Sequence, residues 1–334
     1  MELRSLGKSE IQTPPIIFGA WAIGGWYWGG ANDQQAINAI NASIDSGVNA
    51  FDTAPVYGFG HSETVLGKAL KNKRQKALIF TKVGLRWDSE IGDHFFDVSP
   101  EEGGKRIFRN LRKESIQLEV ENSLQRLQTD YIDVLQCHWP DPSTEVEETM
   151  EALASLVKQG KVRAIGVSNF DIPLLERSIK TLGNIPLASN QPRYSLINRR
   201  IERNVLPWCH QQNIGTIVYS PIERGLLAGT VGPDREFSST DGRSYDPMFK
   251  KENRVAILQA LEETKEICDH HHCTFAQMAA AWCFHQPGVT AALVGARNPK
   301  QAAENAKAAQ IHFSEEELTF LSNHFGVLNF RKKK

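Results

Sequence analysis

Four residues, widely spaced in the sequence, have side chains that can act together on a carbonyl group: Asp52, Tyr57, Lys82 and His138. A tyrosine phenol titrates near ~10, which is too high for easy proton donation at neutral pH. The ammonium of Lys82 is expected to lower that pKa, and Asp52 is expected to keep the lysine charged. His138 is predicted to hydrogen-bond the same oxygen or to orient the substrate. Tyr57 is therefore predicted to be a general acid.

This set supplies an acid but neither a nucleophile nor a metal, so a hydride donor is needed to complete a carbonyl reduction. The residues therefore predict an oxidoreductase with a nicotinamide cofactor. One alternative is an aldolase that forms a Schiff base on Lys82, but the neighbouring Asp52 disfavours the neutral amine that such a nucleophile requires. A metal-dependent barrel hydrolase is disfavoured, because Gly19-Ala20-Trp21 follows the first strand in place of a His-x-His pair, and no metal site is predicted.

The four residues follow short apolar runs, and such runs alternate with segments of helical spacing along most of the chain. The eight predicted strands are 15–18, 48–51, 77–80, 131–135, 162–167, 187–190, 214–218 and 290–294. The predicted helices are 33–46, 62–71, 113–127, 145–159, 172–182, 203–212, 252–269 and 299–309, with Asp33 and Ser62 as caps. Strict alternation implies parallel strands joined by right-handed crossovers.

Eight strand–helix units predict the α/β class and a single (β/α)8 TIM barrel. An open doubly wound sheet is the alternative, but its Gly-x-Gly-x-x-Gly turn is absent after the first strand. Residues 2–13 are expected to form a hairpin that plugs the barrel. Long loops are expected at 84–108, after the third strand, and at 222–250, after the seventh. No linker divides the chain, so 1–334 is predicted to be one domain that ends in a basic tail, 331–334.

Composition excludes several classes of protein. The 38 Lys and Arg against 39 Asp and Glu leave no basic excess for nucleic acid. Residues 11–32 carry no charge, but their Pro and Gly content argues against a membrane span. Five cysteines without a Cys-x-x-Cys pair predict a reducing, cytoplasmic location. The run His270-His271-His272 is interpreted as a solvated helix end, since three adjacent residues cannot all face one ion.

In a parallel barrel the active site lies at the carboxyl ends of the strands. The ends of the predicted strands carry further polar groups in addition to the four named above. They are Thr81, Ser168, Asn169, Gln191, Tyr219 and Ser220. This convergence on one mouth supports a functional site.

Taken in order, these motifs resemble the aldo-keto reductase superfamily, in particular a microbial branch related to potassium channel β subunits. The resemblance covers nearly the whole chain. It is carried by Phe51-Asp52-Thr53-Ala54-x-x-Tyr57-Gly58, Thr81-Lys82, Leu127-Gln128-Thr129-Asp130-Tyr131-Ile132-Asp133, His138-Trp139-Pro140-Asp141-Pro142, Gly160-Lys161-Val162-Arg163-x-Ile165-Gly166-Val167-Ser168-Asn169-Phe170 and Gly295-Ala296-Arg297-Asn298-Pro299. It implies a barrel that binds NADP(H) and reduces aldehydes or ketones to alcohols, with Tyr57, Lys82, Asp52 and His138 as catalytic residues.

The resemblance also implies how the cofactor is held. The nicotinamide would contact Ala20, Trp21, Ser168, Asn169, Gln191 and Tyr219. The pyrophosphate would lie along Ser220, Pro221, Ile222, Gly225 and Leu227. The adenosine end would be held by Gly295, Arg297, Gln301, Glu304 and Asn305. Gly229-Thr230 stands where related proteins have Gly-Lys, so the expected preference for NADPH over NADH depends on Arg297 and Arg243.

The substrate is predicted to be a small carbonyl compound held between aromatic side chains, with Trp21, Trp87 and Trp139 as the binding residues. The alternative function is a regulatory or redox-sensing module that binds NADP(H) and turns over slowly, as channel β subunits do. Those subunits have an amide at the position of His138, so the imidazole favours an enzyme. No heptad pattern predicts an oligomer, and a monomer is compatible with the sequence.

Overall fold

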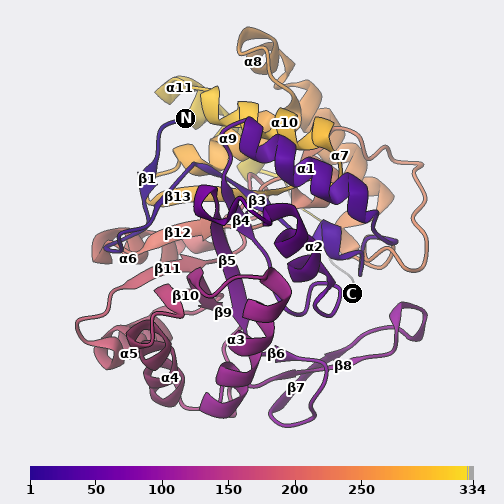
Figure 1. Ribbon diagram of the computed structural model, residues 1–334. Helices are drawn as coiled ribbons and strands as arrows, with labels where there is room; N and C mark the ends of the chain where they lie inside the picture. The colour runs from indigo at the N-terminus through magenta and orange to yellow at the C-terminus, as the bar shows by residue number, and fades with distance from the viewer. Residues whose placement is uncertain (329, 331–334) are drawn as a thin grey trace.

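A closed barrel of eight parallel strands forms the centre of the computed structural model, which describes residues 1–328 and residue 330 (Figure 1). The strands are β3 (Ile16–Gly19), β4 (Ala50–Asp52), β5 (Leu78–Val83), β9 (Ile132–Cys137), β10 (Val162–Ser168), β11 (Leu187–Gln191), β12 (Gly215–Val218) and β13 (Val289–Gly295). They pair in chain order, and β13 closes on β3. All eight predicted strands and the predicted TIM barrel are confirmed, whereas the predicted tail 331–334 lies outside the described residues.

Helices surround the barrel (Figure 1). Those between the strands, with α10 after the last, are α1 (Asp33–Asp45), α2 (His61–Leu70), α3 (Lys113–Leu127), α4 (Val146–Lys158), α5 (Ile172–Leu182), α6 (Val205–Gln212), α7 (Lys251–Glu262), α8 (Lys265–His270), α9 (Phe275–His285) and α10 (Pro299–Lys307). A further helix, α11 (Glu315–Gly326), ends the described fold, and Ser314 and Glu317 form a capping box at its start. In the described part of the chain, no helix is both long enough and apolar enough to cross a bilayer.

The predicted helix 252–269 is wrong in detail, because it divides into α7 and α8, and α9 was not predicted at all. Eight of the eleven residues of α9 are buried, among them Met278, Trp282 and Phe284. A helix that is apolar on every side has no polar stripe, so it gives no amphipathic signal. The predicted cap at Ser62 is also wrong: α2 starts at His61, and Ser62 is buried with its hydroxyl donating to Ala20 O at 2.8 Å. Similarly, Asn32 rather than Asp33 caps α1.

The lower interior of the barrel is apolar, and the strands contribute both small and large side chains to it. This layer consists of Ile17, Ala50, Phe80, Val134, Ala164, Ala188, Ile217, Ala291 and Leu293. The predicted hairpin is present as β1 (Arg4–Ser5) and β2 (Gln12–Thr13), and its Leu6 and Ile11 join the same layer. The hairpin therefore plugs the barrel from below.

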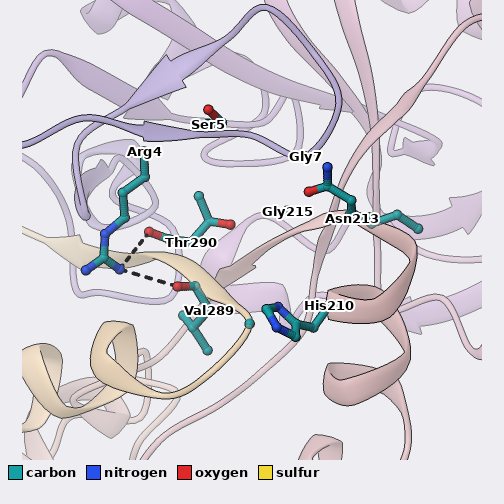
Figure 2. A pocket seen from close by; sticks show the side chains of 10 residues that line it. Arg4, Ser5, Gly7, His210, Asn213, Gly215, Val289 and Thr290 are labelled. Atoms are coloured by element: carbon teal, nitrogen blue, oxygen red, sulfur yellow. Dashed lines mark hydrogen bonds between the residues drawn. The ribbon is translucent and has the colours of Figure 1, made fainter.

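A pocket lies beside this plug, at the amino ends of β12 and β13 (Figure 2). Arg4 extends across it and donates to the carbonyls of Phe284 at 2.6 Å and of Val289 and Thr290 at 3.4 Å each. These bonds fix the hairpin to the wall of the barrel. The pocket is at the end opposite the strand carboxyl ends, so we assign it to the plug and not to the chemistry.

The two long insertions lie near the carboxyl ends of the strands. Residues 84–108, predicted as a loop, instead form a three-stranded antiparallel sheet of β6 (Leu85–Arg86), β8 (Arg106–Arg109) and β7 (Asp93–Asp97), in which β8 extends one residue beyond the predicted loop. Figure 1 shows β7 and β8 projecting from the side of the barrel. The second insertion, 222–250, contains short 3-10 turns at Glu223–Ala228 and Pro247–Phe249, and its Asp241 forms an isolated antiparallel bridge with Trp28.

Candidate active site

A polar layer lies directly above the apolar interior of the barrel. Asp52, Lys82 and Gln136 each lie two residues beyond an apolar interior residue of their own strand (Ala50, Phe80 and Val134, respectively). Because side chains alternate along a strand, a step of two keeps the same inward direction. Lys82 and Gln136 are also direct partners in the β5–β9 register. The sheet therefore places a carboxylate, an ammonium and an amide at one level.

The carboxylate of Asp52 connects this layer. Lys82 Nζ donates to Asp52 Oδ1 at 2.5 Å, while Gln136 and Gln191 donate to Oδ2 at 3.0 and 2.8 Å. Lys82 Nζ also donates to Thr53 O at 2.8 Å and to the Tyr57 hydroxyl at 3.4 Å. Asp52 and Lys82 are buried, and a charged pair is stable there only when its remaining hydrogen-bonding groups are also satisfied. Here they are.

Tyr57 is positioned by a close contact between two loops. Gly58, at φ 65°, packs so tightly that an added Cβ would lie 2.1 Å from Gly24 O, and a Cβ on Gly24 would lie 2.8 Å from the Tyr57 carbonyl carbon. Neither position has room for a side chain. The Tyr57 amide also donates to Ala54 O at 3.1 Å, so the backbone that carries the phenol is held on both sides.

The pKa of Tyr57 differs from the expectation drawn from the sequence. Burial, and then the negative charge of Asp52, raise the pKa of Tyr57 well above its usual value, so the expected lowering by Lys82 is wrong. Desolvation of the phenolate outweighs a lysine whose charge Asp52 already neutralises. Burial also lowers the pKa of Lys82, although Asp52 opposes the shift. Tyr57 is thus a protonated phenol at neutral pH.

His138 faces Tyr57 edge-on, with the two ring centroids 5.6 Å apart and an interplanar angle of 81°. Its backbone amide donates to Val83 O at 2.9 Å, which ties the segment after β9 to β5. Burial, together with the positive charge of Lys82, lowers the pKa of His138 well below its usual value. The imidazole is therefore neutral and retains one N–H to donate.

The residues predicted to bind the nicotinamide form a continuous hydrogen-bonded row along the ends of β10, β11 and β12. The Tyr219 hydroxyl donates to Asn169 Oδ1 at 3.0 Å, Asn169 Nδ2 donates to Ser168 Oγ at 3.0 Å, and Ser168 Oγ donates to Gln191 O at 2.7 Å. Gln191, as noted, also donates to Asp52. The row therefore connects directly to the polar layer that contains Asp52. Ala20, buried after β3, accepts the Ser62 bond below Trp21.

The predicted pyrophosphate segment is a tight turn. Ser220 has a left-handed backbone at φ 58°, and Gly225 has φ 99°, where glycine is favoured. Pro221 is buried and Ile222 is half-buried. Leu227 does not fit the predicted role, because its side chain is fully buried in the core and its amide donates to Ile222 O at 3.2 Å. It supports the turn from below instead of lining it.

The residues predicted for the adenosine end gather around the start of α10. Gln301 Oε1 accepts the Arg297 amide at 2.9 Å, and Asn305 Nδ2 donates to Gly295 O at 3.1 Å. Glu304 accepts from Gln277 through its backbone carbonyl at 2.6 Å, which joins α10 to α9. The Arg297 side chain is exposed. A guanidinium beside a helix N-terminus favours an anion such as phosphate.

Arg243, on which the expected NADPH preference partly depends, has a carboxylate partner in this structure. Its guanidinium pairs with Asp241, with Nη2 2.6 Å from Oδ2 and Nε 2.9 Å from Oδ1, and it stacks 4.6 Å from the Phe237 ring. Asp241 therefore offsets part of its charge, and the role of Arg243 as a phosphate ligand stays a prediction. Both arginines do meet at one residue: Arg243 lies 5.5 Å from the Trp28 ring, and Arg297 Nη1 is 3.5 Å from Trp28 O.

Aromatic side chains surround Tyr57. The Trp21 ring lies 6.1 Å from the Tyr57 ring. Trp87 packs against Phe59 at 5.8 Å, and Trp139 packs against Phe95 at 5.3 Å. Tyr57, Phe59, Trp87, Phe95 and Trp139 belong to one cluster, which also contains Trp26 from the loop after β3 and Phe96 from the 84–108 insertion. Trp21 is not a member of this cluster and adjoins it through its contact with Tyr57. The three tryptophans predicted to bind substrate are therefore gathered near the phenol.

Two residues of the site were not predicted. Gln136 donates a hydrogen bond to Asp52 and accepts one from Gln191 at 3.0 Å. The sequence feature that could have identified it is a polar residue at an inward position of an apolar strand. Glu223, buried below the pyrophosphate turn, accepts from Ser195 Oγ at 2.6 Å and pairs with Arg193. Its signal was weak: an acidic residue directly after the apolar pair Pro221-Ile222, which needs a partner if it is buried.

Comparison with known proteins identifies relatives of this site and fold. The model of the aldo/keto reductase family matches residues 15–324. The chain is 39% identical over 304 residues to the aldo-keto reductase YhdN of Bacillus subtilis (strain 168), covering 90% of this chain and 86% of that protein. It is 36% identical over 322 residues to an NADH-specific methylglyoxal reductase of Escherichia coli (strain K12), covering 95% and 96%.

Solved structures agree. The glycerol dehydrogenase of Gluconobacter oxydans superposes with a TM-score of 0.86 at 36% identity, covering 99% of this chain and 98% of that one. A thermostable aldo-keto reductase in complex with the inhibitor epalrestat superposes with a TM-score of 0.74 at 30% identity, covering 97% and 100%. The chain belongs to the aldo/keto reductase family of oxidoreductases.

Proposed function

We propose that this protein is an NADP(H)-dependent reductase that converts aldehydes and ketones to alcohols, with Tyr57 as the general acid. The observation that carries the proposal is the position of Lys82 Nζ, which bridges Asp52 Oδ1 at 2.5 Å and the Tyr57 hydroxyl at 3.4 Å. The His138 ring lies edge-on to the Tyr57 ring, with the centroids 5.6 Å apart, so an imidazole lies next to the phenol that Lys82 contacts.

The donor set fits a nicotinamide cofactor. The row of Ser168, Asn169 and Tyr219 offers amide and hydroxyl groups for a carboxamide, and the exposed Arg297 at the start of α10 offers a cation for a phosphate. The bound nicotinamide supplies the hydride. In this account Trp21, Trp87 and Trp139 hold the apolar part of the carbonyl compound and exclude water from it.

The proton is controlled by the protein. Tyr57 keeps its proton until negative charge develops on the substrate oxygen, because its pKa is raised in the resting site. The neutral His138 donates an N–H to the same oxygen and orients it. Lys82 then stabilises the phenolate that forms, since it already donates to that hydroxyl. Asp52 and Gln136 keep Lys82 in place throughout.

We further propose a preference for NADPH, supported by the exposed guanidinium of Arg297, and a cytoplasmic location, supported by five free cysteine thiols. The Escherichia coli relative is named as NADH-specific, so the two cofactors must be compared directly. A small carbonyl compound is the proposed partner, with the protein acting as one domain without nucleic acid or membrane.

The test is a panel of aldehydes and ketones offered to the purified protein with NADPH or NADH, followed through cofactor absorbance. We expect turnover with several apolar aldehydes, a higher kcat/KM with NADPH, and loss of turnover in Tyr57→Phe with cofactor affinity retained. Tight cofactor binding without turnover of any carbonyl would instead support the sensor function. Equal turnover by Tyr57→Phe and the wild type would refute Tyr57 as the acid.

A further inference from the structure

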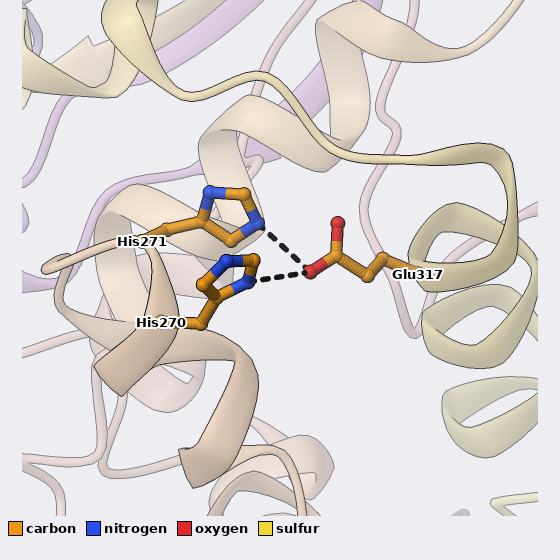
Figure 3. Close-up of side chains that lie close together, drawn as sticks. All are labelled: His270, His271 and Glu317. Atoms are coloured by element: carbon orange, nitrogen blue, oxygen red, sulfur yellow. Dashed lines mark hydrogen bonds and ion pairs between the residues drawn. The ribbon is translucent and has the colours of Figure 1, made fainter.

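A second cluster of potential ligands lies where α8 meets α11. His270 ends α8, His271 follows it, and Glu317 lies in the first turn of α11. His270 Nδ1 is 3.4 Å and His271 Nε2 is 2.9 Å from Glu317 Oε1 (Figure 3). Both imidazoles thus extend from the end of α8 toward a single carboxylate oxygen of α11. The three ligand atoms all lie within 4.8 Å of one another.

The local backbone explains why two adjacent histidines can face one point. His272 has a left-handed backbone at φ 49°, which turns the chain away immediately after His271. The His271 ring is fixed edge-on against Phe313, with centroids 5.1 Å apart. His272 is therefore directed elsewhere. Three adjacent residues cannot all face one ion, but here only two of them do, and Glu317 of α11 completes the set.

Glu317 is held ready to act as a ligand. Its Oε2 accepts the Ser314 amide at 2.8 Å in the capping box, which leaves Oε1 directed at the two imidazoles. Metal-binding carboxylates commonly have their second oxygen fixed in this way.

Two of the three ligand separations are close to those of a tetrahedral ion, and the third is at most 4.8 Å. Metal–nitrogen and metal–oxygen bonds of about 2.0–2.1 Å require neighbouring ligands about 3.3–3.4 Å apart. The two nitrogen–oxygen distances of 3.4 and 2.9 Å are close to that spacing, so small rotations of the side chains would admit an ion. Imidazole nitrogen together with carboxylate oxygen suits Zn²⁺ and similar borderline metals, and suits Mg²⁺ or Ca²⁺ poorly.

We propose that His270, His271 and Glu317 form a binding site for one divalent transition-metal ion of the Zn²⁺ type, with water as the fourth ligand. The ion would join the end of α8 to the first turn of α11. Because it would bind the folded chain and not the separated segments, it would raise the resistance of the protein to unfolding. No residue of the candidate active site belongs to this cluster, so carbonyl reduction is not expected to require the ion.

The experiment uses the full chain without an affinity tag, stripped with a chelator and titrated with Zn²⁺ at neutral pH against a coloured competing chelator. We expect one equivalent of Zn²⁺ per chain and a higher unfolding temperature with the ion. His270→Ala and Glu317→Gln should each weaken binding by about tenfold or more. Glutamine also serves in a capping box, so Glu317→Gln retains the start of α11.

His272→Asn is the matched control, since it removes an adjacent imidazole outside the cluster and asparagine tolerates the left-handed backbone. It should bind Zn²⁺ as the wild type does. Co²⁺ gives a second readout, because a tetrahedral site produces visible absorption that both cluster variants should lose. The proposal is overturned if no stoichiometric binding is seen, or if His270→Ala and Glu317→Gln bind as tightly as His272→Asn.

Discussion

Replacing Asp52 with asparagine should destabilise the fold as well as the chemistry. The substitution keeps the shape of the side chain but removes the counter-charge of Lys82, whose side chain is 0% exposed beside a carboxylate that is 2% exposed. Breaking a buried ion pair by removing one partner costs about 3–5 kcal/mol, because the other charge is left buried or must lose its proton. Against a total stability of about 5–15 kcal/mol, that is a large fraction.

The matched control is Asp93→Asn, which breaks the pair with Arg109 at 2.5 Å in the 84–108 insertion. These side chains are 31% and 23% exposed. Exposed pairs contribute about 0–1 kcal/mol, so the control should lose little. The assay is urea unfolding followed by tryptophan fluorescence and circular dichroism, which gives the free energy of unfolding for each variant.

A third variant separates charge from packing. Adding Lys82→Met to Asp52→Asn removes both charges, and the double variant should be at least about 1 kcal/mol more stable than Asp52→Asn alone. Two results would contradict this prediction. One is that Asp52→Asn loses no more stability than Asp93→Asn, and the other is that the double variant is less stable than Asp52→Asn.

Three further results are expected. Arg297→Ala should raise KM for NADPH by about tenfold, with little change for NADH, because a charge-assisted bond contributes about 1.5–3 kcal/mol; an equal change for both cofactors would contradict this role. Turnover should not fall as pH drops from 8 to the ordinary histidine pKa of 6.5, because His138 stays neutral there, and a fall that His138→Asn abolishes would contradict it. Burial, opposed by Arg86, raises the pKa of Glu119 from 4.5 to about 8. Its contribution to stability should be fully present below 4.5 and lost as pH rises through about 8, with a slope of at most about 1.4 kcal/mol per pH unit that is missing in Glu119→Gln; an unchanged slope in urea unfolding would be evidence against the shift.

Sequence patterns predicted the barrel because alternation of apolar runs and amphipathic segments is a local property. They missed α9 for the same reason, since a helix buried on all sides lacks the polar stripe that the pattern requires. The sheet in 84–108 was also missed. Its β7–β8 pairing joins residues such as Asp97 and Arg106 across a turn, and half-buried and exposed side chains do not alternate regularly along β7.

The residues that we propose as catalytic could be selected from residue types at strand ends, but their electrostatics could not be predicted. The pKa of Tyr57 depends on how much water the folded site excludes, which no spacing reports. Arg243 was expected to help hold a phosphate, and its pairing with Asp241, only two residues away, was not predicted. Gln136 could have been found by the step of two from Val134, had the inward face of that strand been followed to its end.

The central claim is that Tyr57 donates the proton to the carbonyl oxygen. Its most direct test is a single turnover, in which protein saturated with NADPH is mixed rapidly with an aldehyde and loss of the reduced cofactor is recorded. The account predicts that Tyr57→Phe binds NADPH as the wild type does but transfers hydride about 10²–10⁴-fold more slowly. Hydride transfer by Tyr57→Phe at the wild-type rate would contradict it.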